Sequence, residues 1–149
     1  MANEIKAIAG TEYTLEASGA STGDSVYSAA NDANFLASNV AGYVALVFEF
    51  SGALGTTGVT GSIIDVYMQP LNFEGTNDAR PPSTNNQETW VGSIPYDSAA
   101  TTNTFYYKSG ILVNPHPFDD CTFYICNRTG QTLSSGWTLK VTPVTYQPA

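Results

Sequence analysis

The sequence is poor in the side chains on which most enzyme and metal chemistry depends. Its 149 residues include one histidine, two cysteines and five lysines or arginines. One imidazole cannot build a metal site of several histidines, and two thiols are too few for a zinc site without them. Catalysis would have to come from carboxylates, tyrosines and hydroxyls. We therefore expect a binding or structural protein that is not an enzyme and needs no cofactor.

Charge is scarce, and positive charge is the scarcer sign. Charged residues make up 12% of the chain, about half of the ~25% that is usual in globular domains. The net charge is −8 and the basic residues are scattered along the sequence. Nucleic acids and anionic membranes both attract clustered Lys and Arg, so we expect neither as a partner.

Long apolar runs are also missing. No stretch approaches ~18 uninterrupted apolar residues, so no membrane-spanning helix is predicted. Residues 1–6 contain neither the basic region nor the apolar run of a secretory signal. We therefore expect synthesis in the cytoplasm.

What the sequence does contain is a succession of short segments in which apolar and polar residues alternate. Alternation at period two is typical of half-buried strands, and no window shows the period of a helix. Eight such segments, separated by Gly, Pro, Asn and Ser, predict an all-β fold, an antiparallel β-sandwich that is jelly-roll-like. The predicted strands are 12–18, 26–36, 43–50, 62–69, 89–96, 104–113, 121–127 and 137–146.

The length and the even spacing of these segments fit a single domain. We expect residues 1–149 to form one sandwich, with residues 1–10 as an extended N-terminal arm. The apolar face of each strand predicts the core. Its predicted members are Val44, Leu46, Phe48, Ile64, Val66, Phe123, Ile125, Leu139 and Val141.

The two cysteines lie five residues apart in one predicted strand. Odd spacing places Cys121 and Cys126 on opposite faces, and an extended run separates them by roughly 16 Å. A disulfide needs Cα atoms ~4.4–6.8 Å apart. The sequence therefore predicts two buried free thiols.

One short motif resembles a catalytic block, and it has a plainer interpretation. The run Gly23-Asp24-Ser25-Val26 resembles the nucleophile block of GDSL-type hydrolases, which pair it with a histidine three residues after an aspartate. The one histidine is His116, and Val113 stands three residues before it. Without that base a serine has little nucleophilic power, so we interpret the run as a turn.

The remaining polar motifs favour structure over chemistry. Asp119 and Asp120 could bind calcium together with loop carbonyls, but adjacent carboxylates do not form a catalytic pair. Asn127 begins a glycosylation pattern. Next to Gly130 we interpret it instead as shaping a turn between two strands.

One connection is unusually long, and it is our candidate interaction surface. Connections longer than ~12–15 residues are uncommon and are often functional. Residues 72–88 separate two predicted strands. Phe73 and Arg80 are their least ordinary members, and we expect this segment to meet a neighbouring subunit or another partner.

Aromatic residues leave a second functional class open. The chain has nine tyrosines and two tryptophans. Aromatic residues favour strands and pack in sheet cores and interfaces, which accounts for most of them. Exposed rings could instead stack on sugars.

The second half of the chain resembles small structural proteins encoded among the virion genes of tailed bacteriophages. The resemblance covers residues 62–146. The segments that carry it are Asp65-Val66-Tyr67, Pro70-Leu71, Glu74-Gly75-Thr76-Asn77, Trp90-Val91-Gly92-Ser93, Phe123–Gln131 with Leu133, and Thr138–Val144.

This resemblance implies a jelly-roll or sandwich protein on the exterior of the virion. Such proteins often decorate the capsid as a cement. The implied partners are further copies of the chain, with a homotrimer favoured, and the major capsid protein. The alternative is a tail- or fibre-associated module that binds a host surface glycan. No catalytic residues are carried over.

Overall fold

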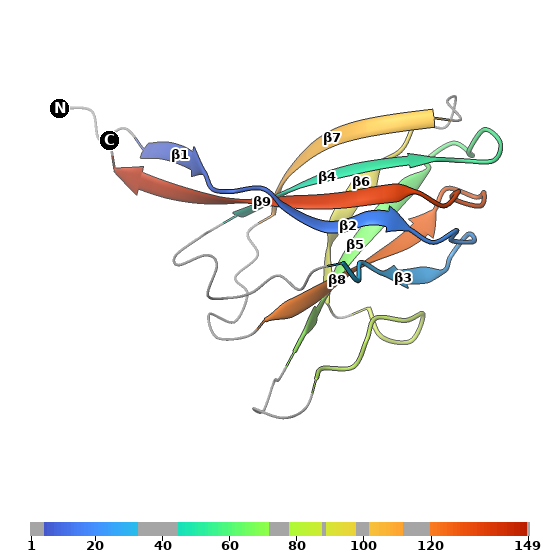
Figure 1. Ribbon diagram of the computed structural model, residues 1–149, viewed down its shortest axis with the longest axis horizontal. Helices are drawn as coiled ribbons and strands as arrows, with labels where there is room; N and C mark the ends of the chain where they lie inside the picture. Colours follow the sequence, from blue (N-terminus) through green and yellow to red (C-terminus); the bar gives the residue numbers. More distant parts are fainter. Residues whose placement is uncertain are drawn as a thin grey trace.

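A computed structural model describes residues 5–32, 45–71, 78–87, 89–97, 102–111 and 120–148. Within these residues the chain forms nine strands (Figure 1). They are β1 (Ile5–Ala9), β2 (Tyr13–Gly19), β3 (Tyr27–Ala29), β4 (Ala45–Ala53), β5 (Ile63–Pro70), β6 (Trp90–Pro95), β7 (Thr102–Ile111), β8 (Cys121–Arg128) and β9 (Trp137–Pro148).

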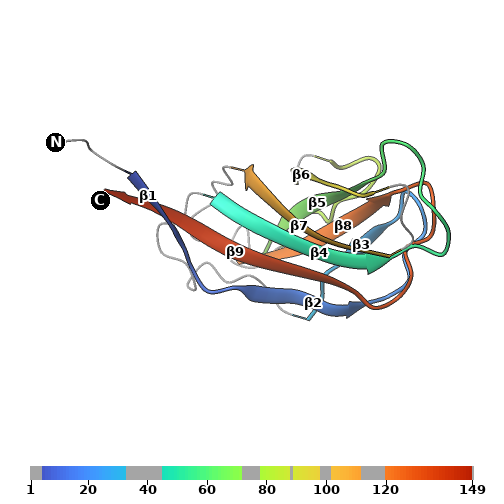
Figure 2. The same cartoon turned by 90° about the horizontal axis from the view of Figure 1, so that it is seen from above.

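The strands form two antiparallel sheets that pack face to face (Figure 2). The five-stranded sheet has the order β1-β9-β4-β7, and β2 also pairs with β9. The four-stranded sheet has the order β3-β8-β5-β6. The predicted all-β sandwich is therefore confirmed. The described residues include no helix that is long and apolar enough to cross a membrane.

Strands that are far apart in the sequence pair in a nested pattern. β5 pairs with β6, β4 with β7, β3 with β8 and β2 with β9. Each successive pair outward from the β5–β6 connection lies in the other sheet. Each half of the chain therefore contributes strands to both sheets around one shared core.

The predicted core is confirmed for every member that the structure describes. Eight side chains are 1% exposed or less, and Val44 lies outside the described residues. The eight are Leu46, Phe48, Ile64, Val66, Phe123, Ile125, Leu139 and Val141. Because each lies on the predicted face of its strand, alternation alone identified which side of each sheet is buried.

Ring contacts join the two layers of the sandwich. Phe48 of β4 meets Phe123 of β8 edge to face, with ring centroids 5.2 Å apart. Such pairs stabilise a protein by ~0.5–1.5 kcal/mol beyond the area they bury. In the five-stranded sheet Phe50 stacks on Trp137 at 6.1 Å.

Trp137 occupies a site that only a glycine at position 19 leaves open. The indole is 1% exposed, and its Nε1 donates a hydrogen bond to the carbonyl of Ala20 at 2.8 Å. A Cβ atom built on Gly19 would lie 1.9 Å from the ring. The close approach of β2 to β9 therefore depends on the missing side chain.

Strand β1 was not among the eight predicted strands. It pairs with the end of β9, from Ile5 opposite Pro148 to Ala9 opposite Val144. Gly10 then donates its N–H to the carbonyl of Pro143 at 2.7 Å, and β2 takes over the pairing from Tyr13 onward. Proline offers no N–H to a neighbouring strand, which suits it to this change of partner.

The contact between Gly19 and Trp137 predicts that Gly19→Ala destabilises the fold. Either the indole or strand β2 must move, and such overpacking costs ~1–3 kcal/mol in the free energy of unfolding. Gly55→Ala is the matched control, because a Cβ there meets nothing within 4 Å. Denaturant unfolding followed by circular dichroism measures both. Equal stability of the two variants would contradict this packing.

Candidate functional site

The structure describes one of the two residues that the sequence singled out for interaction. Phe73 lies outside the described residues. Arg80 is exposed, and its carbonyl accepts a hydrogen bond from Asn86 Nδ2 at 3.1 Å. The two residues are therefore not shown together, and their surface stays a prediction.

The segment around Arg80, within the long connection that the sequence indicated, contains a folded turn. Ser83 and Asn86 exchange backbone hydrogen bonds of 2.9 and 3.0 Å. Gln69 of β5 donates through Nε2 to the carbonyl of Ala79 at 2.7 Å, which holds the segment against the sheet. A small cavity of about 270 Å³ lies between Arg80, Asn86 and Thr89.

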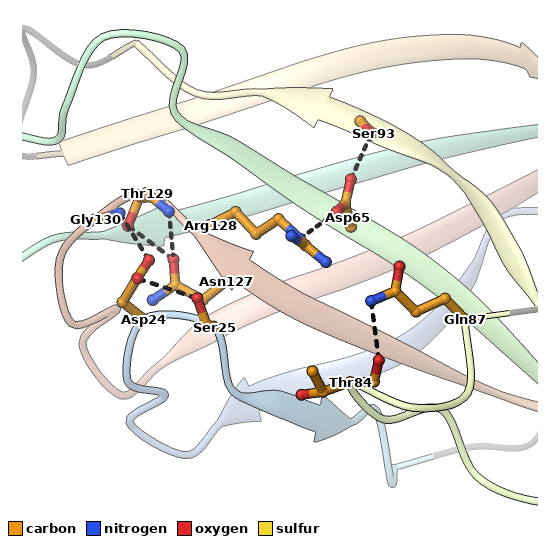
Figure 3. Close-up of polar contacts among 10 residues, drawn as sticks. All are labelled: Asp24, Ser25, Asp65, Thr84, Gln87, Ser93, Asn127, Arg128, Thr129 and Gly130. Carbon is orange, nitrogen blue, oxygen red and sulfur yellow. Dashed lines mark hydrogen bonds and ion pairs between the residues drawn. The ribbon is translucent and has the colours of Figure 1, made fainter.

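The run at Gly23–Val26 is a turn, as interpreted from the sequence. Ser25 is exposed and adopts a φ of 60°, and its Oγ donates to Asp24 at 3.2 Å. The Asp24 carboxylate accepts the N–H of Gly130 at 2.8 Å (Figure 3). These residues fix the turn after β8. His116 and Asp119 lie outside the described residues.

Asn127 is a structural residue of the same turn, as predicted. It is fully buried, and its Nδ2 donates to the carbonyls of Thr22 and Gln131 at 2.9 and 2.7 Å. Its Oδ1 accepts from the N–H and the hydroxyl of Thr129. Both amide hydrogens are engaged, so this asparagine is not accessible for glycosylation in the folded protein.

Both cysteines are buried free thiols, as predicted. Cys121 belongs to the core between the sheets, whereas Cys126 lies on the opposite face of β8, across from Asp65 and Tyr27. Burial raises the pKa of Cys121 to about 12 and also raises the pKa of Cys126. Within the described residues, no three His, Cys, Asp or Glu side chains are grouped to hold a metal ion.

A two-stranded ribbon projects from one end of the sandwich. Strand β1 and the end of β9 run out beyond the other strands (Figures 1 and 2). The last pair that β9 makes with β4 is Val144 with Ala45. In the described part of the chain, β9 pairs beyond Val144 with β1 alone. Residues 6–10 are all exposed, and Ile8 is 42% exposed.

An open groove lies on the outer face of the four-stranded sheet, and the sequence analysis missed it. In β5, Ile64 and Val66 point into the core. Asp65 and Tyr67, which alternate with them, therefore lie on the outer face of the sheet. The groove encloses about 500 Å³. The described residues that line it are Ile63, Asp65, Tyr67, Gln87, Trp90, Ser93 and Arg128.

An ion pair forms the floor of this groove. Arg128 Nε lies 2.7 Å from Asp65 Oδ2, and the Ser93 hydroxyl donates to the other carboxylate oxygen of Asp65 (Figure 3). The Asp65 side chain is 8% exposed, whereas that of Arg128 is 39% exposed. The carboxylate is therefore held from two strands, and the guanidinium faces the groove.

Two side chains from β6 and the preceding loop complete the walls. Trp90 is directly opposite Tyr67 in the strand pairing and is 55% exposed. Gln87 is exposed, and its Nε2 donates a long 3.4 Å hydrogen bond to the carbonyl of Thr84. The Trp90 N–H donates to the carbonyl of Gln87 at 3.2 Å, which ties the loop to the strand.

Tyr67 and Arg128 each have a single charge state at neutral pH. Burial raises the pKa of Tyr67 to about 12, so the phenol is neutral. Interaction with the Tyr67 side chain, with Asp65 contributing, raises the pKa of Arg128 above its ordinary value. The groove thus presents one cation, one anion and neutral hydroxyl and amide groups beside an indole that is 55% exposed. This arrangement suits binding of a polar ligand.

The buried thiols predict slow chemical modification of the native protein. At pH 8 the raised pKa of Cys121 leaves almost no thiolate in the folded state. We expect Ellman's reagent to label neither thiol rapidly until denaturant is added, when both react. The ordinary thiol pKa is 9.0. As the pH rises, Cys121 therefore loses its thiol proton in the unfolded protein before it does so in the folded protein. The free energy of unfolding should therefore fall between pH 9 and pH 12. Rapid native labelling would contradict this burial.

Comparisons with known proteins identify no relative of this chain. It matches no protein-family model, no curated protein and no solved structure. The resemblance of residues 62–146 to phage virion proteins therefore stays a prediction. The ribbon and the groove are the two structural features that bear on function.

Proposed function

We propose that this protein is a non-enzymatic jelly-roll protein of a phage virion, made in the host cytoplasm. It binds the outside of the capsid as a decoration protein and stabilises the capsid. The observation that carries the proposal is the ribbon of β1 and β9, which projects from the sandwich with an exposed strand at its edge. Its partners are other copies of the chain and the major capsid protein.

The nested strand pairing supports the jelly-roll part of the proposal. A jelly roll results when a long hairpin of four strand pairs folds over into two sheets. The pairs β2–β9, β3–β8, β4–β7 and β5–β6 have this arrangement. Jelly rolls occur in viral capsid proteins and in lectins, which supports a virion role only by analogy.

The ribbon supports an assembly role on physical grounds. A two-stranded ribbon by itself is marginally stable in water, so one that projects from a domain gains from a partner. The outer edge of β1 offers backbone N–H and carbonyl groups to an added strand. Ile8 supplies exposed apolar surface at the same place. We infer that the ribbon packs on a second chain.

A trimer suits attachment to a capsid. Several weak contacts made together can raise avidity by ~10²–10⁴ over one contact. Each chain has a net charge of −8, so repulsion between subunits opposes the trimer. Salt screens that repulsion and leaves apolar contacts and strand pairing intact. The oligomer is therefore expected to persist when salt is added.

A second candidate function rests on a different observation. The groove around Trp90 has the composition of a small-ligand site and lies away from the ribbon, on the other sheet. It favours the alternative of a tail- or fibre-associated module that binds a host glycan. The two functions are compatible in one virion protein, because they use separate surfaces.

The proposal predicts that Ile8→Asp breaks the oligomer and leaves the sandwich folded. Placing a carboxylate in an apolar contact removes the burial of isoleucine, worth ~1.5–3 kcal/mol, which is at least about a tenfold loss in association. Light scattering across protein and salt concentrations measures the oligomer. Sedimentation with phage capsids that lack the protein measures attachment.

Val59→Asp is the matched control for this variant. Val59 is 50% exposed, is apolar and lies in the connection between β4 and β5, away from the ribbon. Its change adds the same charge, so it should leave both the oligomer and capsid binding intact. A monomeric wild-type protein at all salt concentrations, or equal behaviour of the two variants, would contradict the proposal.

A further inference from the structure

We propose that the groove on the outer face of the four-stranded sheet binds a neutral sugar ring, with Trp90 stacked on one face of the ring, Arg128 and Gln87 bonded to its hydroxyls, and Asp65 holding Arg128 in place. This site is distinct from the ribbon that carries the assembly proposal. The inference therefore stands or falls independently of capsid attachment.

Trp90 is the first reason to assign a sugar. Most aromatic side chains that the structure describes are buried, yet this indole is 55% exposed beside a groove. The face of an aromatic ring carries partial negative charge and attracts the weakly positive C–H groups on one side of a pyranose. β6 and the Gln87 carbonyl hold the Trp90 backbone, which places the indole at the groove.

The polar groups of the groove are the second reason. A sugar presents hydroxyls on neighbouring carbons, each both a donor and an acceptor, and planar amide, carboxylate and guanidinium groups bond such pairs. Arg128 meets Asp65 in the groove (Figure 3), and Gln87 lines the same groove. The Nε of Arg128 engages Asp65 and the Arg128 side chain also bonds Tyr67, which together fix the guanidinium. The Arg128 side chain is 39% exposed, and a guanidinium has five N–H donors in all. The Gln87 amide adds a donor and an acceptor.

Charge selects a neutral ring over an acidic one. Within the groove one cation, Arg128, is balanced by one anion, Asp65, at 2.7 Å. The chain as a whole has a net charge of −8, which repels uronates, sialic acids and phosphates. Arg128 can donate to the oxygen of a neutral hydroxyl, so the ligand needs no charge of its own.

Size and shape agree with this ligand. Small-molecule sites enclose ~300–1,000 Å³, and this groove encloses about 500 Å³. It is open along the sheet, so a ring within a longer chain fits as well as a terminal one. A protein partner would need a wider apolar surface than a single exposed indole above a charged floor.

The two tryptophans allow a direct test by nuclear magnetic resonance. Wild-type protein labelled with ¹⁵N is titrated with maltohexaose, cellohexaose, chitohexaose and mannohexaose, and the two indole N–H signals are followed. We expect a saturable shift of the Trp90 signal with at least one of these neutral glycans. The Trp137 signal is the internal control, because that indole is buried and bonded to Ala20.

Variants then assign the contacts. Trp90→Ala should weaken binding at least about tenfold, and Trp90→Phe should restore part of it because a ring face returns. Gln87→Ala should weaken binding about fivefold through one lost hydrogen bond. Asn85→Ala, a change in the same loop but outside this groove, should leave binding intact.

Three results would overturn the assignment. The first is no saturable shift of Trp90 with any of the four glycans. The second is binding that survives Trp90→Ala unchanged. Binding to the acidic glycans heparin and polysialic acid, without binding to any of the four neutral glycans, would count in the same way. The third is loss of the oligomer in Trp90→Ala by light scattering, which would make the groove a contact between copies of the chain. The first two results would not bear on the ribbon variant Ile8→Asp, whereas the third would also count against the ribbon as the sole contact between copies.

Discussion

The close packing of aromatic rings between two sheets is the constraint on which the other features depend. Phe48 and Phe123 join the layers, and Trp137 fills a site that Gly19 leaves open. With these rings in place, alternate residues of β5 and β8 must lie on the outer face of their sheet. The outer face can then carry a charged pair at no cost to the core, and the end of β9 can leave the sandwich as a ribbon.

The ribbon and the groove lie on different sheets, so the two proposed functions use separate surfaces. The ribbon continues β9 of the five-stranded sheet, whereas the groove lies on β5, β6 and β8. A protein attached through its ribbon would leave the groove open to the surroundings. One small domain could in this way hold to a particle and present a sugar-binding face outward. Neither role requires a nucleophile, a metal or a general base, which agrees with the residue inventory of the chain.

Alternation in the sequence predicted the strands and the core because each strand has one buried face. It could not predict the groove, since Asp65, Ser93 and Arg128 come together only through the register of three strands. A signal was present in Asp65, an acid inside an otherwise apolar strand. Strand β1 was missed because it is short and its partner is at the far end of the sequence. The turn at Ser83–Asn86 is closed by local backbone hydrogen bonds, and its attachment to the sheet through Gln69 and Ala79 is a contact between distant parts of the chain.

The measurement that tests the central claim most directly is the copy number of this protein in purified virions, determined by quantitative mass analysis. A decoration protein that follows the capsid lattice should occur in numbers comparable with the major capsid protein. A copy number comparable with that of tail or fibre proteins, or absence of the protein from virions, would contradict the account.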